Sequence, residues 1–420
     1  MPGFSLGIIS GRRAEAFVCK LEQRGAADLA RVERPVRRIV EDVRKNGDRA
    51  LRRYAEKWDG LAPKQSFRAS ARELEQAWNS VSPEFHKALE MAADNIRQYC
   101  EWQKPKEWQH SPQPGRKLGQ VVRPLQSAGC YVPGGRYPLP STMLMTVIPA
   151  QVAGVQELRV TSPHPAKETL AAAYFLGVKD FYRMGGAQAI AALAYGTRSL
   201  PRVDKIVGPG NLFVTTAKKL VAFDCAIDFL AGPTEVVVVS HNGNARFIAA
   251  DLVAQAEHDP DALAVFITSC RELAQAVAGE ARKAASENAT AKTSLARNGA
   301  ILIADSREQA LEFANRIAAE HISVDEEDLP AIRNAGSIFV GDYSPQAAGD
   351  YAAGPNHVLP TGAVARCRGG LSVMDFLKVI SVQQLSSEAL SKIAPAVVTL
   401  AEAEGLTAHA ESIRVRCAHA

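Results

Sequence analysis

The amino-acid sequence predicts an α/β protein built on parallel β-sheets. From about residue 120 onward, short apolar runs alternate with segments of helical periodicity, which is typical of parallel strands joined by helices. The runs are apolar on both faces, as strands are when helices cover both sides of a sheet. The chain has 420 residues, enough for two or three domains, so its nine runs fit either one large sheet or two smaller ones.

Ahead of these runs the sequence predicts helices. The segments 35–58 and 70–81 place apolar residues at helical spacing with charged residues between them. The segment 104–117 is rich in proline and lysine and predicts a linker or a loop that crosses between domains.

Run length and periodicity then place the later elements. The expected strands are 128–132, 158–162, 180–184, 205–208, 235–240, 262–269, 300–305, 321–325 and 337–341. The expected helices are 142–154, 167–176, 187–196, 212–222, 244–258, 271–288, 306–319 and 326–335. The polar segment 224–234 is a candidate crossing between two sheets, and residues 380–420 predict helices again.

Composition excludes several classes of protein. The 49 Lys and Arg residues and 45 Asp and Glu residues leave a net charge of +4, which argues against a nucleic-acid or membrane-surface partner. Seven scattered cysteines without a CxxC pair indicate free thiols, so we expect a cytoplasmic protein with no cysteine zinc site. We expect neither a membrane span nor a secretory signal, because no apolar run is long enough.

The first candidate site is the sequence QAEH, in which Gln255 and His258 lie three residues apart near the end of a predicted helix. At this spacing a glutamine oxygen and an imidazole nitrogen leave the same helical face and can bind one ion. The helix dipole also favours a histidine at this end without any ligand, so that simpler interpretation stays open.

The second candidate site is the segment 348–362, which holds Asp350 and His357 among glycines and prolines. We expect an irregular loop here, and loops on an α/β scaffold often carry functional residues. Aspartate and histidine both bind a cation such as zinc. A structured turn with a hydrogen-bonded Asp350 and a surface His357 is the alternative.

The third candidate is the pair Glu320-His321, at the junction between a predicted helix and a predicted strand. A carboxylate beside an imidazole can serve as an acid/base pair, and histidine titrates near neutrality without assistance. The alternative is a helix-terminal histidine with a solvated neighbour. His409, a lone histidine near the end of the chain, would not be singled out by its chemistry alone.

Glycine-rich turns at 131–135, 183–189 and 207–211 each follow an expected strand and precede an expected helix. Ligands of α/β proteins, phosphates included, bind at such turns. The usual dinucleotide pattern GxGxxG and the P-loop pattern are both absent. Each turn can equally be a simple connection that needs a positive φ.

Taken together, these segments resemble the histidinol dehydrogenase family from about residue 35 to the end of the chain. The stretches that carry the resemblance are GCYVPGG (129–135), STMLMTVIPAQVAGV (141–155), GGAQAIAALAYGT (185–197), KIVGPGN (205–211), AGPTE (231–235), DLVAQAEHDP (251–260), NRIAAEH (315–321), YSPQAAGDYAAGPNHVLPTG (343–362), GLSVMDFLK (370–378) and AEAEGLTAHA (401–410).

The resemblance implies two Rossmann-like units, related to aldehyde dehydrogenases, with small helical pieces at both termini. We expect an N-terminal helical piece over 1–30 and a first Rossmann-like domain, with the metal and acid/base residues, over 31–115 and 235–378. The second Rossmann-like domain, over 116–234, is expected to bind NAD. A helical tail over 379–420 is expected to reach the partner subunit of a homodimer.

The family oxidises L-histidinol through its aldehyde to L-histidine in two NAD-dependent steps that end histidine biosynthesis, and it requires one zinc ion per subunit. The resemblance implies the zinc ligands Gln255, His258, Asp350 and, from the partner, His409. It implies the acid/base pair Glu320 and His321 and the NAD contacts Tyr131, Gln188 and Asn211. The implied substrate contacts are Thr234, Gln255, His258, His321, Asp350, Glu404 and His409.

Three residues depart from the family pattern, and alternatives follow from one of them. Thr234 replaces a serine and keeps its hydroxyl, and Ala319 replaces a proline. Arg368 stands where small polar residues are common, and we expect it to place a cation near the site. The nearest alternative is therefore a same-fold zinc dehydrogenase of another polar alcohol, such as a sulfonated or phosphorylated diol. A zinc hydrolase with Glu320 as general base is an alternative from another class.

Overall fold

The computed structural model describes residues 6–25, 29–134 and 138–418. Gly135, the last residue of one expected glycine turn, lies outside these ranges. The chain divides into a larger unit of Met1–Gln103 and Gln126–Phe376 and a smaller unit of Lys104–Leu125 and Leu377–Ala420. No helix in the described ranges is both long enough and apolar enough to cross a membrane.

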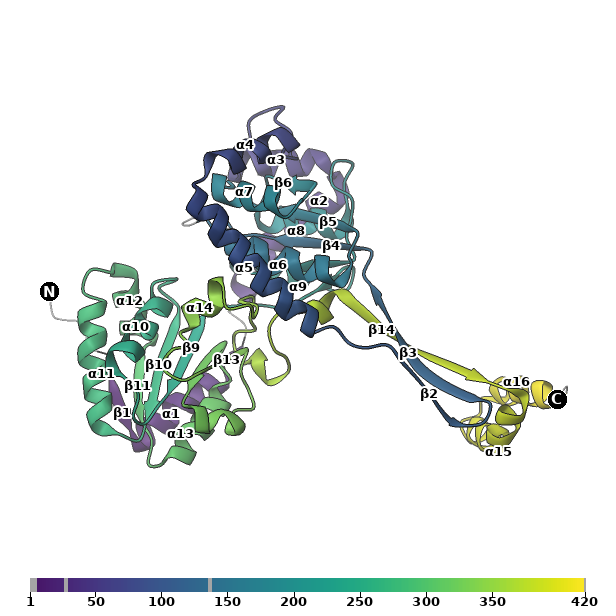
Figure 1. Cartoon of the computed structure of the whole chain (residues 1–420). Coiled ribbons are helices and arrows are strands. Elements are labelled where there is room, and N and C mark those ends of the chain that lie inside the picture. The colour runs from purple at the N-terminus through teal and green to yellow at the C-terminus, as the bar shows by residue number, and fades with distance from the viewer. Residues whose placement is uncertain (1–5, 26–28, 135–137, 419–420) are drawn as a thin grey trace. The chain divides into compact units, whose positions relative to one another are not determined.

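One sheet of the larger unit has five parallel strands in the order β6-β5-β4-β7-β8 (Figure 1). The strands are β4 (Ser127–Tyr131), β5 (Glu157–Thr161), β6 (Asp180–Tyr182), β7 (Lys205–Val207) and β8 (Ala226–Ile227). Four of them confirm the expected strands, whereas β8, two residues long, lies inside the expected crossing. The strand order reverses between β4 and β7, because the chain builds outward from β4 first on one side and then on the other.

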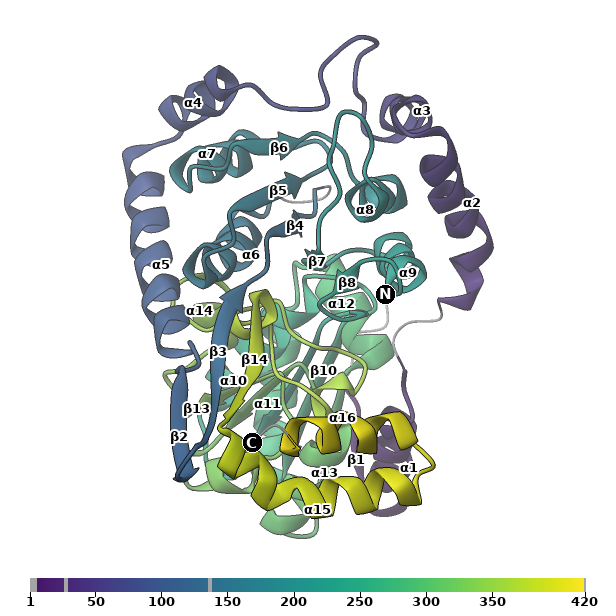
Figure 2. The ribbon, with the colours of Figure 1, turned by 90° about the vertical axis from the view of Figure 1, so that its right-hand side faces the viewer.

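Helices cover both faces of this sheet (Figure 2). Helices α8 and α9 lie on one face with α2 packed against them, and α6 and α7 lie on the other face next to α5 and α4. In α2 the buried residues Val32, Val36, Ile39, Val40 and Val43 recur at helical spacing, so one stripe of that helix faces the core. The bounds are α2 (Ala30–Asn46), α3 (Asp48–Trp58), α4 (Ala71–Ser80), α5 (Pro83–Trp102), α6 (Pro140–Ala153), α7 (Lys167–Phe175), α8 (Gly186–Tyr195) and α9 (Leu212–Val221).

The other sheet of the larger unit has six parallel strands in the order β1-β11-β10-β9-β12-β13. The strands are β1 (Ile8–Ser10), β9 (Glu235–Val239), β10 (Leu263–Thr268), β11 (Ala300–Ile303), β12 (His321–Val324) and β13 (Ser337–Val340). Five of them confirm expected strands. The edge strand β1 was not expected, because it is three residues long and partly exposed.

Helices also cover both faces of the six-stranded sheet, α1 and α13 on one face and α10, α11 and α12 on the other. The expected helix 326–335 is instead the 3-10 helix η1, which contains Pro330. The expected helix 271–288 ends early, and α12 follows as a separate helix capped by Asn288. The bounds are α1 (Gly11–Glu22), α10 (Ala245–Ala256), α11 (Arg271–Ala284), α12 (Ala289–Asn298), η1 (Glu326–Ala331), α13 (Arg307–Ile317), α14 (Gln346–Tyr351), η2 (Val364–Arg366) and η3 (Val373–Phe376).

This packing differs from the expected division of the chain. Helices α2–α5 were expected with the segment 235–378, but they pack against helices of the five-stranded sheet. Strand β1 and helix α1, expected as a separate N-terminal piece, belong to the six-stranded sheet. An amphipathic helix shows in its sequence that it covers an apolar surface, but not which sheet provides that surface.

The smaller unit is an antiparallel sheet in the order β14-β3-β2 followed by two helices. Its elements are β2 (Trp108–Gln113), β3 (Arg116–Pro124), β14 (Leu377–Leu385), α15 (Ser387–Ala403) and α16 (Thr407–Cys417). We expected a linker at 104–117 and only helices after 380, so β2 and most of β14 are corrections. All of β2 and most of β14 are exposed, so no buried apolar run marks these strands.

Candidate active site

The parallel pairing of β9 with β12 brings the candidate catalytic residues together. His321 lies opposite Val236 in this register, so Glu320-His321 at the start of β12 is next to Thr234-Glu235 at the start of β9. A helix that follows a strand of a parallel sheet runs back toward the edge where that strand began. The last turn of α10, with Gln255, therefore returns to the same amino-terminal edge of the six-stranded sheet.

A cavity of about 210 Å³ opens at this edge. Its lining residues include three of the four expected metal ligands, Gln255, His258 and Asp350, and both members of the expected acid/base pair. Further lining residues are Leu139, Ser141, Thr142, Pro209, Gly210, Ala231, Gly232, Thr234, Tyr351, His357, Val358, Leu359 and Thr361. Residues that are far apart in the sequence thus line one cavity.

His321 is held so that one ring nitrogen remains available. Its Nδ1 lies 3.0 Å from the backbone carbonyl oxygen of Glu235. A carbonyl can only accept, so Nδ1 carries the proton and donates it. The other nitrogen, Nε2, is buried without a hydrogen-bond partner and lies 3.6 Å from Asp350 Oδ1. In its neutral form His321 therefore offers the Nε2 lone pair as a base.

Glu320 is tied into a short chain of polar side chains. Its Oε2 accepts hydrogen bonds from the Thr234 hydroxyl and, at 2.8 Å, from the backbone N–H of Glu235. The Thr234 hydroxyl in turn accepts from Nε2 of Gln255. The Gln255 amide is thereby oriented with its NH2 group on Thr234, which leaves its oxygen as the atom for a metal ion.

Burial and neighbouring charges shift the pKa values of Glu320 and His321. Burial raises the pKa of Glu320 to about 7. Burial alone would lower the pKa of His321, but the carboxylates of Glu320 and Asp350 outweigh it and raise that pKa to about 9. Displaced pKa values beside a cavity are typical of acid/base residues.

Asp350 lies in the short helix α14, within the segment 348–362 that we expected to be irregular. Neighbouring side chains hold it in position. His357 is part of this arrangement, since its Nδ1 donates to the Asp350 carbonyl at 2.7 Å and its Nε2 lies 3.2 Å from the Thr142 hydroxyl. Burial alone would raise the pKa of Asp350, but the imidazoles of His321, His357 and His258 lower it. His357 is thus a support for Asp350.

The opposite wall of the cavity comes from the five-stranded sheet. Pro209 and Gly210, in the glycine turn after β7, line it, and Asn211 caps α9 through its side-chain oxygen. An adjoining cavity of about 570 Å³ shares Gly210 and Thr234 and is lined by Asn211. This turn stands beside β4, where the strand order reverses, and open α/β sheets bind ligands at the carboxyl ends of strands at such a point.

Tyr131 and Gln188, the other expected NAD contacts, are buried at the same edge. The Tyr131 hydroxyl accepts from the Gly186 N–H at 3.2 Å, and Gln188 donates to the Asp59 carboxylate at 3.0 Å. Neither residue is among those lining the two cavities. The structure therefore brings Tyr131 and Gln188 close to each other but does not bring them to the pocket wall that Asn211 lines.

Glu404 and His409 belong to the smaller unit, where Glu404 ends α15 and His409 lies in α16. Both are exposed, and neither is among the residues lining the cavity.

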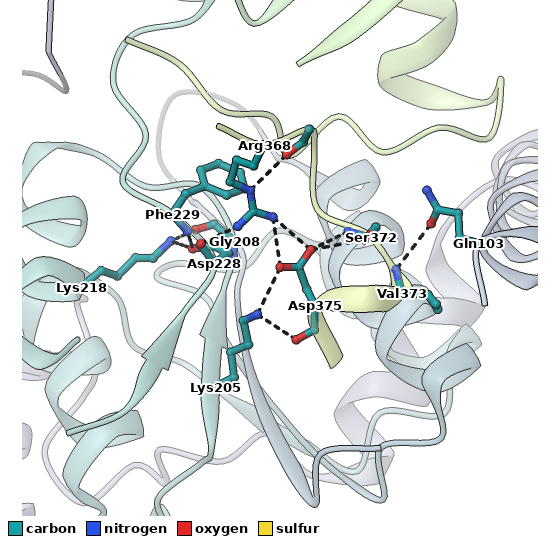
Figure 3. A network of polar contacts seen from close by, with 11 residues as sticks. Gln103, Lys205, Gly208, Lys218, Asp228, Phe229, Arg368, Ser372, Val373 and Asp375 are labelled. Carbon is teal, nitrogen blue, oxygen red and sulfur yellow. Dashed lines mark hydrogen bonds and ion pairs between the residues drawn. The ribbon is translucent and has the colours of Figure 1, made fainter. Parts of the chain in front are cut away.

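Arg368 does not contribute to the lining of the cavity, contrary to our expectation. Its guanidinium donates to the Asp228 carbonyl at 2.7 Å and to both carboxylate oxygens of Asp375, and it lies 4.6 Å from the centre of the Phe229 ring (Figure 3). These contacts hold the Arg368 guanidinium, and none of them involves Glu320 or His321.

Comparisons with known proteins identify the relatives of this chain. A sequence model described as histidinol dehydrogenase matches residues 22–417. The chain belongs to the histidinol dehydrogenase family. It is 45% identical to the histidinol dehydrogenase of Methanosarcina mazei over 96% of each chain, and 46% identical to that of Methanocaldococcus jannaschii over 94% of this chain and 95% of the relative. The crystal structure of histidinol dehydrogenase from Elizabethkingia anophelis matches with a TM-score of 0.93 at 34% identity, over 99% of this chain and 98% of the other.

Membership of the histidinol dehydrogenase family confirms the resemblance, the α/β fold with parallel sheets and the enzyme class, an oxidoreductase. The structure adds contributors that the sequence analysis did not single out. The Glu235 carbonyl fixes the His321 tautomer, Thr142 contacts His357, and Tyr351 lines the cavity beside Asp350. Glu235 lies in the AGPTE stretch, which carries the family resemblance, so its sequence position could have marked it as a site residue. The direction of its carbonyl is visible only in the fold.

The hydroxyl of Thr234 gives a testable prediction about stability. Thr234→Val leaves the Gln255 amide and the buried Glu320 carboxylate without their shared partner, so we expect the free energy of unfolding to fall by about 1–3 kcal/mol. Thr234→Ser keeps the hydroxyl and is the matched control. Urea unfolding of the metal-free protein measures both, and equal stability of the two variants would contradict the polar chain described above.

Proposed function

We propose that this chain oxidises L-histidinol through L-histidinaldehyde to L-histidine, in two NAD-dependent steps that require zinc and that end histidine biosynthesis. Two findings support the proposal, namely family membership and the grouping of His321, Glu320, Gln255, His258 and Asp350 around one cavity. The observation that carries it is the unpartnered Nε2 of His321, a buried base that faces a site lined by metal-binding side chains.

The donor set fits a zinc ion. An amide oxygen, an imidazole and a carboxylate from Gln255, His258 and Asp350 line one cavity, and such nitrogen and oxygen donors suit zinc. Within the described ranges, no three His, Cys, Asp or Glu side chains form a group that could hold a metal. When bound, the cation would orient the substrate and favour the unprotonated form of His321.

When bound, NAD would supply the hydride acceptor for both proposed oxidations. In the first, Nε2 of His321 accepts the proton of the substrate hydroxyl. The aldehyde stays in the site, and Glu320 accepts a proton from the water that adds to its carbonyl carbon. After His321 has passed the first proton to solvent, its Nε2 accepts a hydroxyl proton of this hydrate as the second hydride leaves. A carboxyl group with a pKa of about 7 suits this role, because it can take up and release a proton near neutrality.

We place the dinucleotide at the carboxyl end of β4 and β7, against the turn that contains Pro209, Gly210 and Asn211. Tyr131 and Gln188 stay part of this proposal as residues of the same edge, where the Tyr131 hydroxyl accepts from the Gly186 N–H at the start of α8 and Gln188 lies in that helix. Thr234 and the metal ligands are proposed to contact the substrate beside it.

We propose a homodimer in which Glu404 and His409 of the partner subunit complete each site. Both residues are exposed in the smaller unit, which also exposes many apolar side chains. These are Trp108, Val379, Ile380, Val382, Leu400, Leu406 and Val415. Exposed apolar surface of this kind marks an interaction site, and a second copy of the chain is the proposed partner.

The alternative substrates lose the feature that suggested them. Arg368 was the cation that favoured an anionic diol, and its partners are Asp228 and Asp375 instead. A hydrolase would leave the pocket at the carboxyl end of β7 without a role. The cytoplasmic location stays a proposal, and the seven cysteines are free thiols, which is typical of a reducing compartment.

The reaction itself has a direct test. Zinc-loaded protein with L-histidinol and NAD is expected to form about two NADH per histidinol consumed, because both oxidations occur before release. Absorbance at the NADH band and quantified histidine measure the ratio. A ratio near one with free aldehyde, or no turnover while an anionic diol is oxidised, would contradict the proposal.

The acid/base pair predicts a split between the two oxidations. His321→Asn is expected to slow oxidation of both histidinol and histidinaldehyde, by about 10²–10⁴-fold, because both lose a base at Nε2. Glu320→Gln is expected to slow mainly the aldehyde step. Single-turnover measurements with each substrate separate the steps, and equal rates of Glu320→Gln and wild type on the aldehyde would refute the role given to Glu320.

The shared site predicts complementation between two inactive variants. When His321→Ala and His409→Ala chains form mixed dimers, one site per dimer regains both residues, so a random mixture should recover about a quarter of wild-type activity. Co-expression of two differently tagged chains gives this mixture, and each variant alone is the control. No recovery in purified mixed dimers would place His409 in the same chain as His321.

A further inference from the structure

A buried ion pair, Lys218–Asp228, lies behind the glycine turn that lines the cavity (Figure 3). Lys218 belongs to α9, and Asp228 follows β8. Only 3% of the Lys218 side chain and 0% of the Asp228 side chain are exposed. Removing two charges from water is costly, and apolar side chains of similar volume often stabilise a protein equally well. Stability alone therefore does not explain this buried pair.

Both members of the pair hold Gly208, the first residue of the turn. The Lys218 ammonium donates to the Gly208 carbonyl at 3.0 Å, and Asp228 Oδ2 accepts from the Gly208 N–H at 2.8 Å. Gly208 has a φ of 114°, and a Cβ atom there would lie 2.1 Å from the Tyr131 carbonyl oxygen. The two charges thus hold the backbone in a conformation that a side chain would not permit.

The position of Gly208 determines where the next three residues lie. Pro209 and Gly210 line the cavity with the acid/base residues, and Asn211 lines the adjoining one. Asp228 also leads into the segment Ala231–Gly232, which lines both cavities. One ion pair therefore fixes the two loops that face the six-stranded sheet.

A second set of ionic contacts anchors Asp228 from its backbone. Arg368 donates to the Asp228 carbonyl, and Asp375 joins Arg368 to Lys205, whose Nζ lies 3.1 Å from Asp375 Oδ1 (Figure 3). Asp228 is thus held at its carboxylate and at its carbonyl. This arrangement gives Arg368 a structural role in the same network.

We propose that Lys218 and Asp228 are positioning residues that set the affinity for the dinucleotide by fixing the turn Gly208–Asn211. The inference rests on the proposed function, because it takes NAD as the ligand of this turn. It predicts that loss of the pair raises the KM for NAD and leaves zinc content and the KM for histidinol near their wild-type values.

The variants separate positioning from stability. Lys218→Met leaves Asp228 as an uncompensated buried charge and should lower the melting temperature and raise the KM for NAD at least about tenfold. The double variant Lys218→Met/Asp228→Leu removes both charges and should regain much of the melting temperature. Its KM for NAD should stay raised, because neither residue then holds Gly208. Recovery of the KM together with the melting temperature would overturn the proposal.

A control for the buried carboxylate is the Arg307–Asp328 pair, in which Asp328 is 2% exposed and accepts from Arg307 Nε at 2.6 Å, whereas the Arg307 side chain is partly exposed. Neither residue lines the two cavities. Asp328→Asn should lower the melting temperature without raising the KM for NAD, and an equal rise there would also overturn the proposal.

Hydrogen exchange supplies a readout that does not depend on activity. In the zinc-free and NAD-free protein, peptides that cover 205–213 should exchange faster in the double variant than in wild type, and peptides of β9 and β12 should not. Suppose that wild type oxidises histidinol with NAD, but that the variants keep the wild-type KM for NAD and the wild-type hydrogen-exchange rates. In that case this inference fails and the proposed function stands. If wild type shows no such turnover, the proposed function fails instead.

Discussion

The parallel register of β9 and β12 is the constraint on which the site depends. It places the Glu235 carbonyl against Nδ1 of His321 and the Glu235 N–H against Glu320, so the backbone of one residue orients both members of the proposed acid/base pair. A shift of one residue would turn His321 to the other face of the sheet. The register itself is secured by buried β-branched side chains along both strands.

The two sheets contribute opposite edges to one cavity. The six-stranded sheet supplies its amino-terminal edge, where a helix end and two strand starts carry the polar side chains. The five-stranded sheet supplies its carboxyl edge, where glycine turns allow close approach of a ligand. One edge therefore suits a cation and proton transfer, and the other suits a dinucleotide. Under the proposed function, this division gives the chain a metal site and a dinucleotide site without a GxGxxG pattern.

Local patterns in the sequence predicted most of the fold. Nine strands of the two parallel sheets followed from apolar runs, because those strands are buried on both faces. The same reasoning missed β1 and β8, which are too short, and β2, β3 and β14, in each of which at most one residue is buried. It also assigned α2–α5 to the wrong sheet, since amphipathic periodicity carries no information about the partner surface.

Of the site, the residue types at Gln255, His258, Asp350 and Glu320-His321 were visible, but the orienting Glu235 carbonyl and the partners of Arg368 depend on tertiary contacts.

We propose that the amino-terminal edge of the six-stranded sheet forms most of a metal site. Anomalous diffraction from a crystal of the zinc-loaded protein, recorded on both sides of the zinc absorption edge, locates the ion and its ligands. We expect one zinc peak per copy, bound by Gln255, His258 and Asp350 and by His409 of the partner subunit. A peak whose ligands exclude Gln255 and Asp350, or a fourth ligand from the same copy, would contradict it.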